Sequence, residues 1–300
     1  MTKWITTRER GSILAINIMV WMCRRCNHRL VSLLLYPIAA YFFVTSRVAH
    51  KASKRFFALA TAETGWLNFY RQLLCFSRSL VDRITMLNGD ADVFKVNHSG
   101  RDVLMNSLKD GRGLIMLGSH LGNFEACQLL ADDRMGITIH VVAYFAGSAK
   151  VRQALDAINP ALRSRLINPA EPDAVLRMRD VISKGGVLAV LGDRTGIGNR
   201  KVTVEFMGKP ADFPSGPYHL AAILGCPVFC FFGLRTGPFA YDTCAIRLLD
   251  SLPINRRKRE GEILLYAQKY ADILAEKARE YPSNWFNFYE FWNGPTDSKP

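Results

Sequence analysis

Acidic residues are almost missing from the start of this chain. Glu9 is the only one among the first 60 residues, which carry ten lysines and arginines. This segment therefore holds nine of the thirteen net positive charges of the 300-residue protein. A nucleic-acid-binding protein is expected to spread its charge differently, so we predict no nucleic-acid partner. Basic clusters beside apolar runs are typical of attachment to an anionic membrane surface, where each Lys or Arg contributes about 1 kcal/mol.

The basic N-terminal segment also lacks an uncharged run of the roughly 20 residues that a membrane-spanning helix needs. Two shorter apolar runs lie at 12–23 and 30–46, and the second is 17 residues long and contains Pro37. Three interpretations stay open: a tilted span or re-entrant segment, a pair of helices lying in the membrane interface, or two buried core helices. We expect residues 1–52 to form a membrane anchor, with the rest of the chain on its positively flanked, cytoplasmic side.

The residues around these runs fit a membrane surface. Three arginines separate the two runs, and Trp21, Tyr36 and Tyr41 are of the aromatic type that gathers at membrane interfaces. A secretory signal peptide is not indicated, because no small-residue cleavage site follows a single apolar stretch.

A disulfide framework, internal repeats and low-complexity linkers are also missing. The seven cysteines are an odd number and are scattered, which favours a reducing compartment. Cys23 and Cys26 have metal-ligand spacing but no second pair nearby, so no metal site is predicted. A content of 49% hydrophobic and 22% charged residues excludes a disordered chain and a multi-span transporter.

After residue 60 short apolar strands alternate with helical patterns. This alternation predicts an α/β fold, with a largely parallel central sheet flanked by helices and following the N-terminal membrane-anchoring helical segment. We expect one α/β domain over 53–300. The expected helices lie at 53–86, 101–109, 123–131, 150–158, 174–184, 217–224 and 261–280, and the expected strands at 113–117, 137–145, 186–191, 202–206 and 227–234.

The most informative segment reads LIMLGSHLGNFEACQLL, from residue 114 to 130. A buried strand leads into a turn with His120, and Glu125 follows in the first turn of the next helix. The two side chains can meet at the carboxyl end of the strand, where open α/β sheets bind ligands. A histidine oriented by a carboxylate is a general base. The alternative is a surface histidine near a glutamate that only favours the helix dipole, and Ser119 lies outside any G-x-S-x-G pattern of a hydrolase.

These residues resemble a known family. GSHLGNFEA is similar to the H-x4-D/E motif of the lysophospholipid acyltransferase superfamily, and most like the bacterial late acyltransferases of lipid A biosynthesis. The segment 192–235, with its Asp after a strand, Phe-x-Gly step and Gly-Pro, resembles the second block of that family. The aromatic segment PSNWFNFYEFW at 282–292 resembles the closing block, and the opening ERGS with the apolar run ending YFF resembles the anchor.

The resemblance implies acyl transfer from an acyl carrier protein thioester to a hydroxyl of a membrane glycolipid, at the cytoplasmic face of a bacterial inner membrane and without a cofactor. His120 is then the base and Glu125 its partner. An Arg after the second strand often serves the oxyanion in this family, and Arg163 is the candidate for that role, with Arg165 as its rival. Substrate-binding roles are expected for Asn123, Arg163, Asp193 and Arg194.

One departure concerns the acceptor. Lipid A enzymes usually close with a basic run, whereas this chain has Tyr289, Glu290 and Phe291. Glu290 would repel a phosphate at short range, which predicts a neutral or weakly charged acceptor lipid. A thioesterase and a non-catalytic membrane-surface protein remain the rival functions. The basic run 256–259 could bind an acidic carrier protein or lipid headgroups, or could be a solvated helix start.

Overall fold

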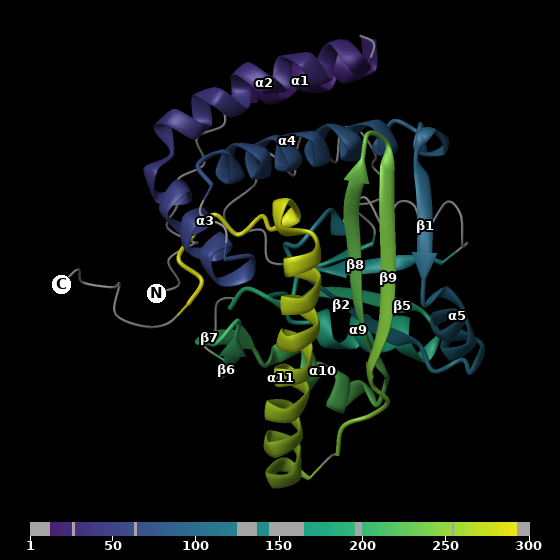
Figure 1. The fold of residues 1–300 in the computed structure, drawn as a ribbon. Helices are drawn as coiled ribbons and strands as arrows, with labels where there is room; N and C mark the ends of the chain where they lie inside the picture. The colour runs from purple at the N-terminus through teal and green to yellow at the C-terminus, as the bar shows by residue number, and fades with distance from the viewer. Residues whose placement is uncertain are drawn as a thin grey trace, which may run out of the picture.

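A seven-stranded sheet, mostly parallel, forms the centre of the protein and has helices on both faces (Figure 1). The computed structural model describes residues 13–25, 28–62, 65–124, 137–143, 165–195, 200–253 and 255–292. The strand order is β1-β9-β8-β2-β5-β3-β4, and only the β8–β9 pair is antiparallel. The predicted α/β class with a largely parallel sheet is therefore confirmed.

The strands of this sheet differ in length and burial. β2 and β5 are central and read as nearly continuous apolar runs, LIMLG and VLAVL, because both faces of a parallel strand are covered. Successive side chains of β2 alternate between two cores, one holding Ile115 and Leu117 and the other Leu114 and Met116. The bounds are β1 Lys95–Ser99, β2 Leu114–Gly118, β3 Ile139–Val142, β4 Leu166–Ile167, β5 Val187–Leu191, β8 Val228–Gly237 and β9 Ala240–Leu249.

The helices bury one side against these cores. α11 has buried residues at helical spacing, among them Ile263, Ala267, Tyr270 and Leu274, and it packs on the larger core. The Asn255 side chain caps its start by accepting the N–H groups of Arg257 and Lys258. α11 spans Arg256–Glu280. The other helices are α1 Ile13–Arg25, α2 His28–Thr45, α3 Arg47–Ala60, α4 Leu67–Leu87, α5 Arg101–Lys109, α9 Ala174–Ser183 and α10 Gly216–Leu224, with short 3-10 turns at Ala91–Val93 and Pro282–Asn284.

Several expectations of the secondary structure need correction. The single helix predicted over 53–86 is two helices, α3 and α4, that are separated around Gly65. The strand predicted at 202–206 is confirmed as β6 Lys201–Phe206, and it pairs with β7 Lys209–Pro214 in a separate two-stranded sheet. β1, β4, β7 and β9 were not predicted. The helices predicted at 123–131 and 150–158 lie outside the described residues, apart from Asn123 and Phe124.

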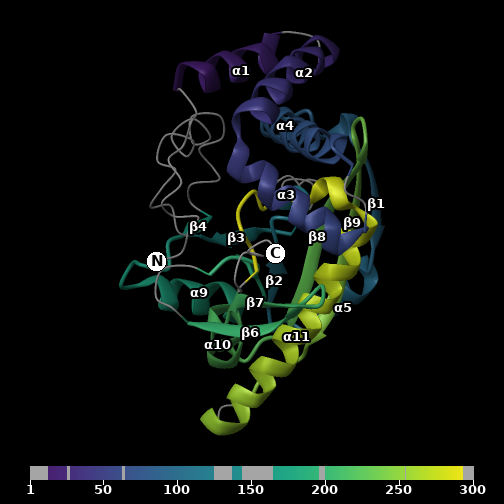
Figure 2. The same ribbon diagram turned by 60° about the vertical axis from the view of Figure 1, so that its left-hand side comes forward.

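The first helices form a layer of their own on α4. Figure 2 shows α1 and α2 as a hairpin above α4, at the opposite end of the molecule from the start of α11. Val31, Leu35 and Ala39 of α2 pack there against Phe69 and other apolar residues of α4, in what we call the α2–α4 core. The boundary expected between residues 52 and 53 falls inside α3.

None of the helices in the described part of the chain is long and apolar enough to cross a bilayer alone. Residues 30–45 of α2 together with α3 meet the requirements of length and composition as a pair, but they are bent by 93°. The run predicted at 12–23 forms α1, and the run at 30–46 forms α2. A membrane anchor is therefore not confirmed.

Candidate active site

His120 and Asp193 meet at the carboxyl end of the sheet. β2 and β5 are parallel neighbours in which Gly118 is opposite Leu191. Each of the two residues follows its strand at the same distance, two positions after this last pair. His120 Nδ1 lies 2.8 Å from Asp193 Oδ1, and the backbone N–H of His120 donates to Asp193 Oδ2 at 2.8 Å. The carboxylate thus fixes both the ring and the backbone of the histidine.

Asp193 is fully buried, and its side chain is held in the ionised form by its surroundings. Burial alone would raise the pKa of a carboxyl group. The His120 ring, the Arg194 guanidinium and the Asn287 amide act in the other direction and lower the pKa of Asp193 from 3.8 to about 2. An ionised Asp193 accepts a hydrogen bond from Nδ1–H, so the other ring nitrogen, Nε2, is the proton acceptor of His120.

The lowered pKa of Asp193 predicts a loss of stability in acid. The contribution, about 2 kcal/mol from the difference between 3.8 and 2, is present above pH 4 and is lost as the pH falls toward 2. By pH 3 about half of it should be gone. The measurement is the free energy of unfolding of the wild type and of Asp193→Asn in urea at pH 6 and pH 3. We expect the gap between them to narrow by about 1 kcal/mol, and a constant gap would contradict the assignment.

The turn that carries His120 is held by backbone hydrogen bonds on both sides. Phe286 N donates to His120 O at 2.8 Å, and Gly122 N donates to Asn284 O at 2.8 Å. Asn123 N donates to the carbonyl of Gly233 at 2.7 Å. Gly122 has a φ of +79°, and a Cβ at this position would lie 2.1 Å from the Gly233 oxygen. Only glycine fits there, because the turn passes directly against the backbone of β8.

Asn287 joins the His120–Asp193 pair to the partly buried Arg194. Its side-chain Nδ2 donates to Asp193 Oδ2 at 2.8 Å, and its Oδ1 accepts the Nε–H of Arg194 at 2.7 Å. Arg194 also donates to the carbonyl of Phe286 at 3.2 Å, and its guanidinium lies over the Tyr289 ring, 5.4 Å from the centroid. Burial lowers the pKa of Arg194, whereas Asp193 and Tyr289 raise it. An ordered chain of four polar groups therefore runs along one wall of the site.

A cavity of about 360 Å³ opens beside these four polar groups. His120, whose side chain is 26% exposed, and Arg194 supply its charged or titratable lining, and the remaining lining is largely apolar. The wall comes from α4, the His120 turn, the end of β5 and the C-terminal aromatic segment. The lining residues are Phe76, Ser79, Leu80, Ser119, His120, Gly122, Asn123, Phe124, Leu191, Arg194, Phe286, Phe288 and Tyr289.

Asn123 lines the cavity and connects the turn to α4. Its side-chain Nδ2 donates to the Ser79 carbonyl at 2.7 Å and lies 3.5 Å from the Tyr241 hydroxyl. That hydroxyl donates to the buried Asp82 of α4, which also pairs with Arg235 of β8 at 2.8 Å. The amide N–H groups of Asn123 thus connect the His120 turn to α4 beside the cavity.

Two predicted site residues, Glu125 and Arg163, lie outside the described residues. The carboxylate that contacts His120 in the described part is Asp193, which had been assigned to substrate binding. Arg165 lies just before β4, whereas His120 lies just after β2 and two other strands separate β2 from β4. Arg165 is not among the residues that line the cavity. Arg194 is therefore the arginine that the described structure brings to the histidine.

The repulsion expected between Glu290 and a phosphorylated acceptor is not supported by the structure. Glu290 does not line the cavity, and its Oε2 accepts from Arg55 Nη1 of α3 at 2.6 Å. The negative charge is therefore balanced by an arginine. Phe291 is buried in the larger core, and only Tyr289 of the three residues reaches the cavity.

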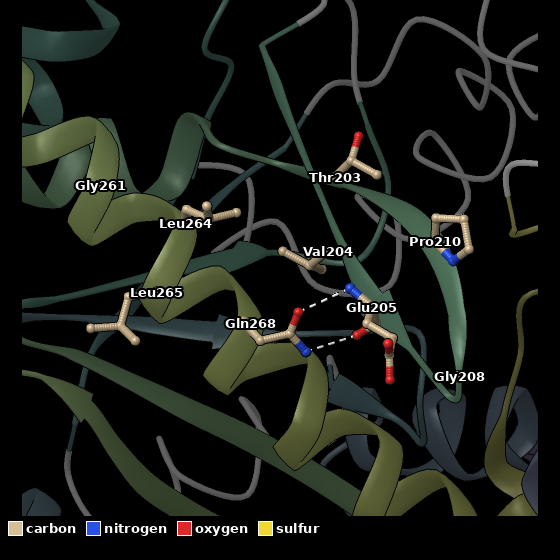
Figure 3. Close-up of a pocket in the computed structure, with 9 residues that line it drawn as sticks. All are labelled: Thr203, Val204, Glu205, Gly208, Pro210, Gly261, Leu264, Leu265 and Gln268. Carbon is tan, nitrogen blue, oxygen red and sulfur yellow. Dashed lines mark hydrogen bonds between the residues drawn. The ribbon is translucent and has the colours of Figure 1, made fainter.

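A second hollow of about 620 Å³ lies between the β6–β7 hairpin and α11 (Figure 3). Gln268 joins the two elements, since its Oε1 accepts from the N–H of Glu205 and its Nε2 donates to the Glu205 carbonyl, both at 2.9 Å. Leu264, Leu265 and Pro210 contribute most of its apolar lining. In contrast to the cavity at His120, the lining of this hollow contains no base paired with a carboxylate.

The arrangement at His120 can remove a proton from a hydroxyl or a water that enters the cavity.

Sequence reasoning missed Asn287. Asn284 and Asn287 are the only amides in the aromatic segment 282–292, and these two polar residues were an available signal.

No protein-family model and no curated protein sequence matches the chain.

Proposed function

We propose that this protein is an O-acyltransferase that moves a fatty acyl group from an acyl carrier protein thioester to a hydroxyl of a membrane lipid. The observation that carries the proposal is the His120–Asp193 pair at the mouth of a largely apolar cavity. The pair supplies a general base, and the apolar lining suits an acyl chain. The motif resemblance supports the same reaction.

The reaction needs one base that acts twice. Nε2 of His120 takes the proton of the acceptor hydroxyl as its oxygen attacks the thioester carbonyl. The C–S bond of the tetrahedral intermediate then breaks, and the imidazolium returns the proton to the departing thiolate. Asp193 stabilises the imidazolium through Nδ1 in both steps. The products are an oxygen ester and a thiol, and no cofactor is consumed.

Arg194 is the group that would stabilise the oxyanion. The backbone N–H groups of the turn are already engaged, because those of residues 120 to 123 donate to Asp193, Ser119, Asn284 and Gly233 in order. The Arg194 guanidinium borders the same cavity and is fixed by Asn287 and Tyr289. A preorganised cation in a water-poor site is an effective partner for developing negative charge. The Arg163 alternative stays a prediction.

The test is an acyl transfer assay with acyl carrier protein thioester and a crude membrane lipid extract. Lipid-dependent formation of an acylated lipid supports the proposal. Release of fatty acid without lipid product would assign a thioesterase instead, since water can replace the hydroxyl at the same base. Absence of both products, with the folded wild-type chain, would leave a membrane-surface binding protein.

A neutral or weakly charged acceptor should be preferred over a phosphorylated one. The single cation in the described lining, Arg194, is next to the buried carboxylate of Asp193, so these residues offer no unbalanced positive charge to a phosphate. The measurement is the rate with a neutral hydroxylated glycolipid and with its phosphorylated counterpart, using one donor. We expect at least about tenfold faster turnover of the neutral acceptor, equal to about 1.4 kcal/mol. Faster turnover of the phosphorylated acceptor would contradict this expectation.

A further inference from the structure

Helix α2 is apolar on both of its sides. Val31, Leu35 and Ala39 are buried in the α2–α4 core. The opposite side carries an equally apolar stripe at helical spacing, which includes Leu33 and Val44 at 64% and 75% exposed. A helix at the surface of a globular protein normally turns polar residues outward. Nothing in the described part of the chain covers this stripe.

Apolar exposure is concentrated in this part of the molecule. Twelve of the nineteen large hydrophobic side chains that are exposed in the described residues precede residue 81, namely Ile18, Trp21, Leu30, Leu33, Leu34, Tyr36, Tyr41, Val44, Val48, Trp66, Leu67 and Leu80. Exposed basic residues lie among them, including Arg25, Arg47, Lys51, Lys54 and Arg71. Between Ile13 and Val81 the sequence has a single acid, Glu63.

We infer that the α1–α2 hairpin lies flat on an anionic lipid bilayer, with the outer stripe of α2 in the headgroup and upper acyl region. Apolar residues rimmed by cations and almost without anions match the chemistry of such a surface better than that of a protein partner, whose interface would be expected to offer acids or polar groups of both kinds. Exposed tryptophan and tyrosine belong to the same interfacial depth.

The packing of α2 shows why the hairpin lies on the bilayer and does not cross it. The inner side of α2 is part of the α2–α4 core, and α4 holds it further through Arg78, whose Nη2 donates to the Tyr36 hydroxyl at 2.8 Å, and Tyr70, whose hydroxyl donates to the Tyr36 carbonyl at 3.2 Å. A perpendicular α2 would draw Arg71 and Arg78 of α4 into hydrocarbon, which is costly. The 93° bend between α2 and α3 returns the chain to the catalytic domain.

The same layer leads to the catalytic cavity. Phe288 packs against the α2–α4 core and makes an edge contact with Phe76, with 5.4 Å between the ring centroids. Both rings line the cavity, as does Leu80 of α4, which is 44% exposed. Resting on the proposed function, this continuity lets a lipid acceptor reach His120 from the bilayer side without passing through water.

The first test measures binding of the purified full-length chain to vesicles. Partitioning onto phosphatidylcholine vesicles with about a quarter phosphatidylglycerol is compared for the wild type and for the double variant Leu33→Asp/Val44→Asp. We expect at least a tenfold loss for this variant. The matched control, Leu176→Asp/Ile223→Asp, changes two equally exposed apolar residues on α9 and α10 and should stay within twofold of the wild type. No wild-type binding, or equal losses in both variants, would overturn the inference.

A pair of charge reversals tests the contribution of the exposed basic residues near the apolar stripe of α2. Arg47→Glu/Lys51→Glu should weaken binding to the anionic vesicles several-fold, and neutral vesicles should reduce the difference. Arg257→Glu/Lys258→Glu is the control, because these exposed residues lie at the start of α11, at the far end of the molecule from α1 and α2 (Figure 1). Equal weakening by both pairs would mean that the attraction is not specific to the α1–α2 face.

The second test separates lying from spanning. Leu30→Trp and Val44→Trp are made in a Trp4→Phe/Trp21→Phe/Trp66→Phe background, which keeps only the buried Trp285 and Trp292. Quenching by lipids brominated near the headgroup or deep in the acyl chain is compared after subtraction of the background signal. The two positions are 14 residues apart, or about 21 Å along a helix. Stronger quenching by the shallow bromines at both positions supports the inference. Deep quenching at either position would show a span and overturn it.

These measurements need no acyl transfer, and the transfer assay can be run with a detergent-solubilised acceptor. Vesicle binding without transfer would therefore refute the proposed function alone. Transfer in detergent without vesicle binding would refute the surface orientation alone.

Discussion

Replacing His120 with alanine should lower the rate of acyl transfer by about 10² to 10⁴, the range that a positioned general base contributes. In the proposed mechanism the ring takes the proton of the acceptor hydroxyl, and the described lining of the cavity offers no second imidazole or carboxylate for that role. The side chain is partly exposed at the cavity and is not part of an apolar core, so the fold should survive its loss. The measurement is single-turnover transfer from the carrier thioester.

A second histidine serves as the matched control. His98 lies on the edge strand β1, where its Nδ1 is 2.7 Å from the Thr243 hydroxyl, and it does not line the cavity. His98→Ala should keep transfer within about threefold of the wild type, while thermal unfolding of both variants should remain cooperative. Near-normal turnover of a folded His120→Ala would remove the histidine from the mechanism.

Asp193→Asn should reduce transfer by at least about 10², although the side chain keeps its size. The carboxamide presents either its oxygen or its NH2 to Nδ1, and the remaining group must face the His120 N–H and the Asn287 NH2, which are both donors. The carbonyl oxygen is drawn to those donors, so the NH2 faces Nδ1 and moves the ring proton to Nε2. A protonated Nε2 cannot accept the proton of the acceptor hydroxyl.

The comparison with Glu125→Gln decides which carboxylate assists the histidine. If Asp193 is the partner, Glu125→Gln should reduce the rate of acyl transfer clearly less than Asp193→Asn does. The motif resemblance makes the opposite prediction, because it assigns the partner role to Glu125. A large loss in Glu125→Gln together with near-normal activity in Asp193→Asn would return the role to Glu125. Large losses in both would show that His120 depends on two carboxylates.

Local pattern predicted the elements that flank the site. The strands at 113–117 and 186–191 are confirmed as β2 and β5 with a shift of one residue, and the helix at 174–184 is confirmed as α9. Their apolar runs and turn residues are local signals. The position of Asp193 also follows from such signals, because two parallel strands that pair end to end bring the residues after them together.

Contacts between segments that are distant along the chain could not be predicted from the sequence. The ion pair of Arg55 with Glu290 joins residues 235 positions apart, and Asn287 reaches Asp193 across 94 positions. Neither contact produces a periodic pattern in the sequence. A charged or amide residue in an aromatic segment gives the same sequence pattern whether its side chain faces solvent or a buried partner. β9 was missed for a related reason: only its pairing with β1 and β8 makes its polar positions part of a sheet.

The hydrogen bonds from Phe286 and Asn287 to the histidine pair have a consequence for synthesis of the protein. His120 and Asp193 leave the ribosome long before the segment that fixes His120 O and Asp193 Oδ2 has been translated. A nascent chain can build the sheet but not a finished catalytic pair. In the proposed mechanism His120 therefore becomes a positioned base only after residue 287 has been translated, and a chain terminated before residue 286 lacks both hydrogen bonds.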